Sequence, residues 1–109
     1  MGRTRYKPAY DLSKAKDLAR QGSMMLSRRP TKFLAERYSS VGTAALEIFS
    51  AIKPEDFYKS IELDNRPGKW ADVYQEVEYD GIGWYVKFFI EDDGAVVLVW
   101  SMNYDGAMH

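Results

Sequence analysis

The chain has no cysteine and a single histidine, and both shortages narrow its possible chemistry. Without cysteine it has neither a disulfide framework nor a Cys-based zinc site, which fits the reducing cytoplasm that we predict as its location. The histidine is His109, the last residue, so no His/Cys set has tetrahedral spacing and we predict no metal site. Walker loops and dinucleotide glycine fingerprints are also missing, and we predict no cofactor.

Long apolar runs are absent as well. No stretch approaches the roughly 20 residues that span a bilayer, and the basic N-terminus is followed by no apolar signal segment. We therefore expect no membrane partner. The contents of 46% hydrophobic and 28% charged residues are typical of a globular protein. We predict one domain over residues 1–109 with a single core.

Charge is distributed unevenly along the chain. Residues 1–40 contain ten Lys/Arg and three Asp/Glu (+7), whereas residues 41–109 contain five and thirteen (−8). The excess of positive charge in the first half favours a surface that binds a polyanion such as nucleic acid. The alternative is that these charged residues simply cover the solvent-exposed faces of helices.

The first half of the chain has helical signals. Asp11 or Ser13 can cap a helix that ends at Gly22. Pro30 is suited to the first turn of a second helix that runs to about Tyr38. A third helix is predicted over about 43–52, and the short apolar segment 24–26 predicts a small edge strand.

A fourth, short helix is predicted to begin at residues 53–56. Pro54 fits its first position, and the following Glu55 and Asp56 suit the positive end of its dipole. Phe57 and Ile61 are four residues apart, so we expect them to share its buried side.

From residue 69 onward the pattern is that of strands. Segments 70–79, 82–91 and 95–102 are rich in aromatic and β-branched residues, and Asp80-Gly81 is a strong tight-turn signal. Alternation in the second strand predicts one face for the core and another for solvent. The core face would carry Trp84, Val86, Phe88 and Ile90, and the other face Tyr85, Lys87 and Phe89. We predict an α+β fold, with N-terminal helices packed on a C-terminal antiparallel sheet.

Candidate chemistry centres on that other face. Tyr85 and Lys87 are two residues apart and point the same way, and Lys59, Arg66 and Lys69 flank the preceding strand. Such a cluster suits a phosphodiester, because cations stabilise charge on phosphate oxygens and a Lys or Tyr can transfer a proton. The alternative is that Tyr85 and Lys87 are ordinary polar-face residues.

Aromatic residues on the same face could stack unpaired bases. The candidates are Tyr58, Tyr74 and Phe89. Equally, a small domain uses its aromatic residues to fill its core.

Two short motifs, Asp56-Phe-Tyr-Lys-Ser60 and Trp70-x-Asp-Val-Tyr74, resemble the MqsR-like (motility quorum-sensing regulator) toxins. The likeness extends over about residues 8–101. It implies a RelE-like, barnase-related fold and a bacterial, metal-independent endoribonuclease (mRNA interferase). Its implied partners are the RNA substrate and a cognate antitoxin, with DNA reached only through that antitoxin.

The resemblance also implies a site. Lys59 takes the place of the family's catalytic lysine and Tyr85 that of its catalytic tyrosine, while Lys87 matches a basic strand position. From these we predict catalysis by 2′-OH attack on the adjacent phosphate. Further RNA contacts are predicted at Tyr58, Arg66, Lys69, Tyr74, Gln75, Arg28 and Arg29, with Lys32 as a possible extension.

The chain departs from the family pattern at two positions. Ala71 stands where the family usually has Gln, and Ser101-Met-Asn103 stands where it usually has Ser-Phe-Lys, so a second active-site lysine is absent. Gln75 could substitute in part. The alternative function is a weakened or inactive member that serves as an interaction module for an antitoxin, and a third option is a nucleic-acid-binding regulator.

Overall fold

The computed structural model describes residues 3–91 and 93–104. Within them the α-helices are α1 (Leu12–Arg20), α2 (Arg28–Ala35) and α3 (Val41–Ser50). The Asp11 carboxylate caps α1 by accepting from the backbone of Ser13 and Lys14, and Gly22 follows its end with a φ of +87°. None of the described helices is both long and apolar enough to cross a membrane.

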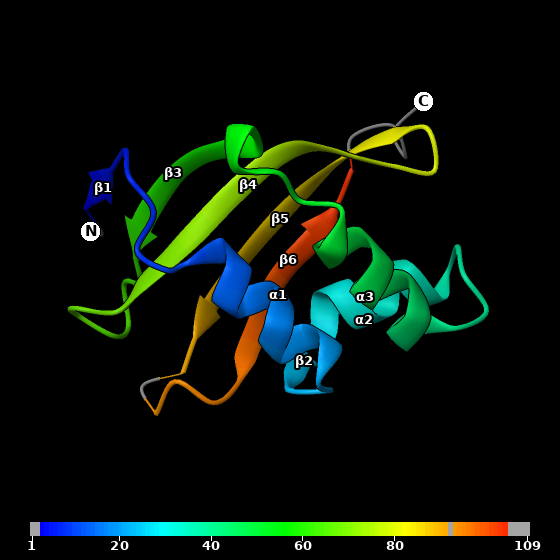
Figure 1. Ribbon diagram of the computed structural model, residues 1–109, viewed down its shortest axis with the longest axis horizontal. Helices are drawn as coiled ribbons and strands as arrows, with labels where there is room; N and C mark the ends of the chain where they lie inside the picture. The colour runs from blue at the N-terminus through cyan, green and yellow to red at the C-terminus, as the bar shows by residue number, and fades with distance from the viewer. Residues whose placement is uncertain (1–2, 92, 105–109) are drawn as a thin grey trace.

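The strands form one sheet in the order β1-β3-β4-β5-β6-β2 (Figure 1). Their bounds are β1 (Thr4–Arg5), β2 (Met24–Leu26), β3 (Phe57–Glu62), β4 (Trp70–Tyr79), β5 (Ile82–Ile90) and β6 (Val97–Asn103). All neighbours are antiparallel except β2, which pairs with β6 in parallel at the sheet edge. The predicted α+β fold and the predicted edge strand at residues 24–26 are confirmed.

The predicted fourth helix is wrong. Only Pro54–Asp56 forms a 3-10 turn, and Phe57–Glu62 is strand β3, which pairs with β1 and β4. Phe57 and Ile61 do not share a buried side, because a register shift after Phe57 places Phe57 opposite Tyr74 and Ile61 opposite Ala71. The two neighbouring strands provide hydrogen-bond partners for the backbone N–H and C=O groups of this segment. This tertiary pairing outweighs the local helix signals.

The helices lie over one face of the sheet, gathered towards β5 and β6, whereas β1 and β3 extend beyond them (Figure 1). The predicted core face of β5 is confirmed: Trp84, Val86, Phe88 and Ile90 all belong to the buried cluster. Facing them from the helices are Ala15, Leu34, Ala45, Ile48 and Phe49. The alternate side chains of β5, which are Tyr85, Lys87 and Phe89, lie on the opposite face of the sheet.

Candidate functional site

Lys59 and Lys87 lie in one row across the sheet. Lys59 pairs with Val73 on β4, and Val73 pairs in turn with Lys87 on β5. Residues paired in this way point to the same face, which here is the one opposite the helices. We call it the open face, defined by Lys59, Val73, Tyr85 and Lys87. Two strand spacings separate the lysine backbones by about 10 Å, a gap that two lysine side chains and a phosphate can bridge.

The motif around Lys59 fixes its orientation. The Asp56 carboxylate accepts from the Lys53 backbone at 2.9 Å and so closes the turn before β3. Phe57 packs edge-on against Tyr74 with ring centroids 5.5 Å apart. Ser60 is fully buried and donates to the Ala71 carbonyl at 3.2 Å. With its neighbour Ser60 held in the core, Lys59 must point to the open face.

Tyr85 and Lys87 adjoin each other on β5, and both are half-buried. Burial raises the pKa of the Tyr85 phenol, and the nearby Tyr58 phenol raises it further. Burial lowers the pKa of the Lys87 ammonium, and the positive charge of Arg29 lowers it further. The Tyr85 phenol therefore keeps its proton at neutral pH, and the Lys87 ammonium gives up its proton more readily than that of a free lysine.

Tyr58 and Arg29 border this pair from two sides. Tyr58 is exposed, and its ring centroid lies 4.8 Å from the Lys59 ammonium. Arg29 lies in the first turn of α2 with Arg28, and both are exposed. The structure thus places Tyr58 and Arg29 next to the predicted cluster. Arg28 and Lys32 are exposed residues of α2, the helix that also carries Arg29.

Arg66 and Lys69 lie at the far end of the open face. The Arg66 guanidinium is 3.3 Å from the Glu91 carboxylate and 5.4 Å from the centre of the Phe89 ring. Lys69 is buried, and its ammonium donates to the Ile90 carbonyl at 2.5 Å. Arg66 borders the cluster, whereas the Lys69 ammonium is engaged inside the protein.

The predicted placement of Tyr74 on the same face is wrong. Its side chain is only 1% exposed and stacks on Phe88 in the core, with ring centroids 5.9 Å apart. Phe89 does lie beside Lys87 on the open side but is 2% exposed, so little of its ring is accessible. Gln75 is exposed after Tyr74, at a register shift that ends the regular alternation of β4.

Two cavities flank the lysine row. One, of about 660 Å³, is bordered by Tyr85, Gln75, Glu76, Gly83, Asn103 and Tyr104, among others. The second, of about 530 Å³, is bordered by Lys87, Arg66, Phe89, Ile61 and Trp100, among others. Tyr85 and Lys87 thus separate two hollows, each large enough for a nucleotide unit.

Trp100 and Glu76 are potential site residues that the sequence analysis missed. The β5–β6 register shifts after Lys87, so Trp100 has no paired residue on β5 and does not follow the regular in-and-out alternation of β6. Its side chain is 45% exposed. Glu76 follows the shift in β4 and has a φ of +59°, rare for a residue with a side chain. The β-bulges that re-aim these side chains leave no clear local signal in the sequence.

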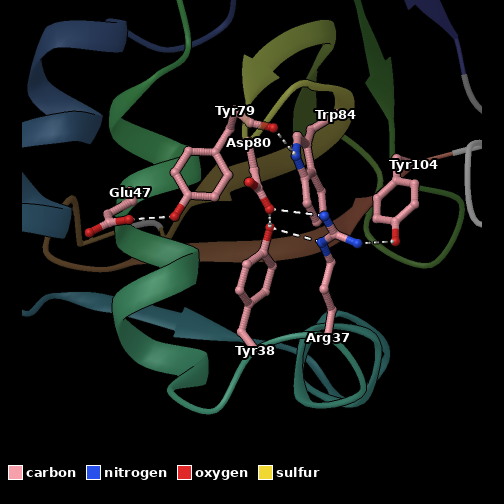
Figure 2. A network of polar contacts seen from close by, with 7 residues as sticks. All are labelled: Arg37, Tyr38, Glu47, Tyr79, Asp80, Trp84 and Tyr104. Atoms are coloured by element: carbon pink, nitrogen blue, oxygen red, sulfur yellow. Dashed lines mark hydrogen bonds and ion pairs between the residues drawn. The ribbon is translucent and has the colours of Figure 1, made fainter.

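A polar network, which we call the hairpin clasp, holds the turn between β4 and β5 (Figure 2). Asp80 accepts from Arg37 and Tyr38, each at 2.9 Å, and these two partners lower its pKa. Arg37 also donates to the Tyr104 hydroxyl at 3.4 Å. Tyr79 donates to Glu47, which raises the pKa of the Tyr79 phenol to about 12. The clasp joins the hairpin to the helices and fixes one wall of the larger cavity.

The described residues contain no group of three or more His, Asp and Glu side chains with the spacing of a metal site. His109 lies outside the described residues.

Comparison with known proteins bears on the identity of the chain. Residues 7–102 match the family model described as "Motility quorum-sensing regulator, toxin of MqsA". The comparison with curated proteins returned no match. Because the matched segment covers most of the 109 residues and contains both motifs, the chain belongs to the MqsR toxin family of toxin–antitoxin systems.

Proposed function

We propose that the protein is a metal-independent endoribonuclease that cleaves single-stranded RNA at the open face. The observation that carries the proposal is the row in which Lys59 and Lys87 flank Val73, with Tyr85 beside Lys87 on the face opposite the one on which the helices pack (Figure 1). Two cations at this spacing can hold the oxygens of one phosphate between them. Family membership supports the proposal, and it implies a cognate antitoxin as the protein partner.

The reaction uses the 2′-hydroxyl of the RNA as nucleophile. Its oxygen attacks the adjacent phosphorus, the bond from phosphorus to the 5′ oxygen breaks, and the products are a 2′,3′-cyclic phosphate and a 5′-hydroxyl. The Tyr85 hydroxyl is suited to relay the 2′-hydroxyl proton to the leaving 5′ oxygen, and the Lys87 ammonium is suited to hold a phosphate oxygen. Lys59 stabilises the charge that develops on the phosphate.

The remaining predicted contacts have unequal support. Tyr58, Arg29 and Gln75 border the row and are retained as RNA contacts, with Arg28 and Arg66 at its margins. Tyr74 and Lys69 are omitted because their side chains are engaged in the core.

The test is cleavage of a long single-stranded RNA in EDTA by the wild type, Lys59→Ala and Lys53→Ala. Lys53 is an exposed lysine just before β3 and outside the row, so it controls for loss of charge. We expect cleavage by the wild type and Lys53→Ala, and a rate at least about a hundredfold lower for Lys59→Ala. Equal rates for both variants would refute the site, and cleavage that requires a divalent metal would refute the mechanism.

A second candidate function is an antitoxin-bound interaction module without RNase activity. Asn103 pairs directly with Tyr85, so the place of the family's second lysine beside the tyrosine is occupied by a neutral side chain. Ala71 is fully buried opposite Ile61 and supplies no polar group. Growth arrest on expression that depends on Lys59 would exclude this function, whereas partner binding without arrest would support it.

A further inference from the structure

We propose that a third cavity, on the helix side of the sheet, is a binding site for a phosphomonoester, with Arg5 and Lys14 as the residues that hold the anion. The cavity has a volume of about 530 Å³. It lies where the N-terminal segment, the start of α1 and the ends of the β3–β4 and β5–β6 loops meet. The proposal goes beyond the proposed cleavage of RNA, because the cavity and the lysine row belong to opposite faces of the sheet.

Strand register places Arg5 on the helix side. Arg5 on β1 pairs with Ser60 on β3, and Ser60 pairs with Asp72 on β4. Asp72 pairs in turn with Phe88 on β5, whose ring packs against Phe49 of α3 with centroids 5.0 Å apart. Residues paired in this way point to the same face, so the Arg5 side chain lies on the face on which the helices pack. Because β1 and β3 extend beyond the helices, this part of that face is left uncovered by them (Figure 1).

The Arg5 guanidinium is held in place by stacking. Its central carbon lies 4.4 Å from the centre of the Trp70 ring. Stacking uses the flat face of a guanidinium and leaves its N–H groups, which lie in the plane, for an acceptor. Among the described residues none of these N–H groups has a hydrogen-bond partner, and the Nε atom is completely buried. Arg5 borders the cavity, so its terminal amino groups are the donors that a ligand can reach.

The carboxylates around the cavity are engaged elsewhere. Asp11 accepts from the backbone at the start of α1, and Glu91 lies 3.3 Å from the Arg66 guanidinium. Burial raises the pKa of Asp72, and of the groups that oppose this rise the charge of Arg5 has the smallest effect. The positive charge of Arg5 is therefore only weakly neutralised by the protein, which favours an anion beside it.

Lys14 supplies a second cation from the first turn of α1. Its side chain is exposed, and the part of the chain that the structure describes offers it no hydrogen bond or ion pair. The ammonium lies against Gly94 of the β5–β6 loop, where a Cβ on the glycine would be only 3.3 Å from Nζ. Lys14 thus reaches from α1 to the β5–β6 loop, and both of these residues border the cavity.

The two cations suit a phosphomonoester better than a carboxylate or a phosphodiester. An arginine can donate two parallel hydrogen bonds to two oxygens of one anion, and a lysine acts as a compact charge beside a further oxygen. A phosphomonoester has three terminal oxygens and a charge near −2, so it can satisfy both residues at once. A carboxylate and a phosphodiester each have two such oxygens and a single charge. The source of the phosphate is either the 5′ end of an RNA chain or a small phosphorylated molecule.

The test is a titration of the full-length, 15N-labelled protein with inorganic phosphate at constant ionic strength, followed by backbone amide NMR shifts. We expect saturable shifts at Trp70 and Gly94, which border the cavity. The Kd should rise at least about tenfold in Arg5→Gln and about threefold or more in Lys14→Gln. Lys7→Gln is the matched control, because Lys7 is exposed and does not border the cavity, and its Kd should equal that of the wild type.

Lys14→Gln keeps the test decisive if Arg5→Gln fails to fold, because Lys14 is an exposed residue with no contact to lose. Shifts that do not saturate, or a Kd that is the same in Lys14→Gln and in the wild type, overturn the site. None of these measurements depends on RNA cleavage. The site can therefore fail while Lys59-dependent cleavage stands, and the reverse also holds.

Further ligands identify the source of the phosphate. A 2′-O-methyl oligonucleotide that shifts the cavity amides only when its 5′ end is phosphorylated supports the site and points to the end of an RNA chain. Binding of glycerol phosphate without binding of either oligonucleotide supports the site and points to a small molecule. Equal binding of the 5′-hydroxyl oligonucleotide overturns the phosphomonoester assignment. So does a hexaglutamate peptide that shifts the same amides at lower concentration than phosphate, since it would indicate a surface for an acidic protein segment.

Discussion

Ser60 and Asp72, one from each of the two motifs, lie directly opposite each other on β3 and β4, and both are fully buried. The Asp72 carboxylate accepts from the backbone N–H of Ala9 at 2.9 and 3.1 Å and from that of Tyr10 at 3.0 Å. Burial still raises its pKa, because the cost of desolvation exceeds the effect of these hydrogen bonds. Ser60 and Asp72 therefore have a structural role in the two motifs: Asp72 binds the N-terminal segment to the sheet beside the lysine row.

Asp72→Ala should destabilise the fold. It leaves the buried N–H groups of Ala9 and Tyr10 without an acceptor, so we expect the free energy of unfolding to fall by about 2–4 kcal/mol. Urea unfolding followed by tryptophan fluorescence measures the change. Asp64→Ala in the exposed β3–β4 loop is the control and should shift it by less than about 0.5 kcal/mol. Equal urea midpoints for Asp72→Ala and Asp64→Ala would contradict the stabilising role of Asp72.

Acid should detach the N-terminal strand through Glu62. Two hydrogen bonds from the Arg3 guanidinium, at 3.0 and 3.1 Å, and one from the Gly68 backbone lower the pKa of Glu62 from about 4.5 to about 2. A lowered carboxyl pKa stabilises the fold above the ordinary value, and this contribution is lost as the pH falls through about 2. The protection of the β1 amides against hydrogen exchange, measured relative to the intrinsic rate at each pH, should therefore fall between about pH 4.5 and about 2.

Arg3→Gln provides the control for this pH dependence. It removes the largest cause of the shift, so β1 should already be weakly protected at pH 5 and should change little on acidification. An acid-induced loss of protection as large as that of the wild type would show that another carboxylate is responsible.

Asn103→Lys should raise the rate of RNA cleavage. Asn103 pairs with Tyr85, so a lysine there adds a cation next to the proposed proton donor, worth about 10- to 100-fold in rate. Single-turnover cleavage in EDTA is the measurement. Gln21→Lys, at the exposed end of α1, adds the same charge away from the open face and should leave the rate unchanged. Equal acceleration in both variants would indicate a general charge effect.

Trp100→Ala should weaken RNA binding. Trp100 is 45% exposed in the cavity that contains Lys87, where a base can stack on its indole. We expect about a tenfold weaker affinity for a 2′-O-methyl oligonucleotide, which lacks the nucleophile and so reports binding alone. Anisotropy of the labelled oligonucleotide measures it. Trp100→Phe should retain most of the affinity, and Tyr6→Ala, an exposed aromatic change outside this cavity, should retain all of it.

The sequence was sufficient where the signal is local. Asp11 and Gly22 mark the ends of α1 because capping and left-handed backbone depend on single residues and their neighbours. Alternation along β5 correctly divided Trp84 and Phe88 from Tyr85 and Lys87, since side chains of a strand alternate wherever the ladder is regular.

Local signals failed where pairing partners decide the structure. Phe57 and Ile61 have the spacing of a helix face, yet their segment is a strand because β1 and β4 supply the hydrogen bonds of its backbone. Tyr74 is in the core rather than on the open face, as its pairing with Val86 on β5 requires.

By itself, the sequence determined the α+β order of elements, the family and the identity of the charged strand residues, because each follows from composition, periodicity or short motifs. Only the tertiary structure decided that Lys59 and Lys87 share one row, that Lys69 turns inward, and that Glu76 and Trp100 face the two cavities. The physical reason is strand register: one inserted residue at a bulge reverses which side chains face solvent, and the partner strands set its position.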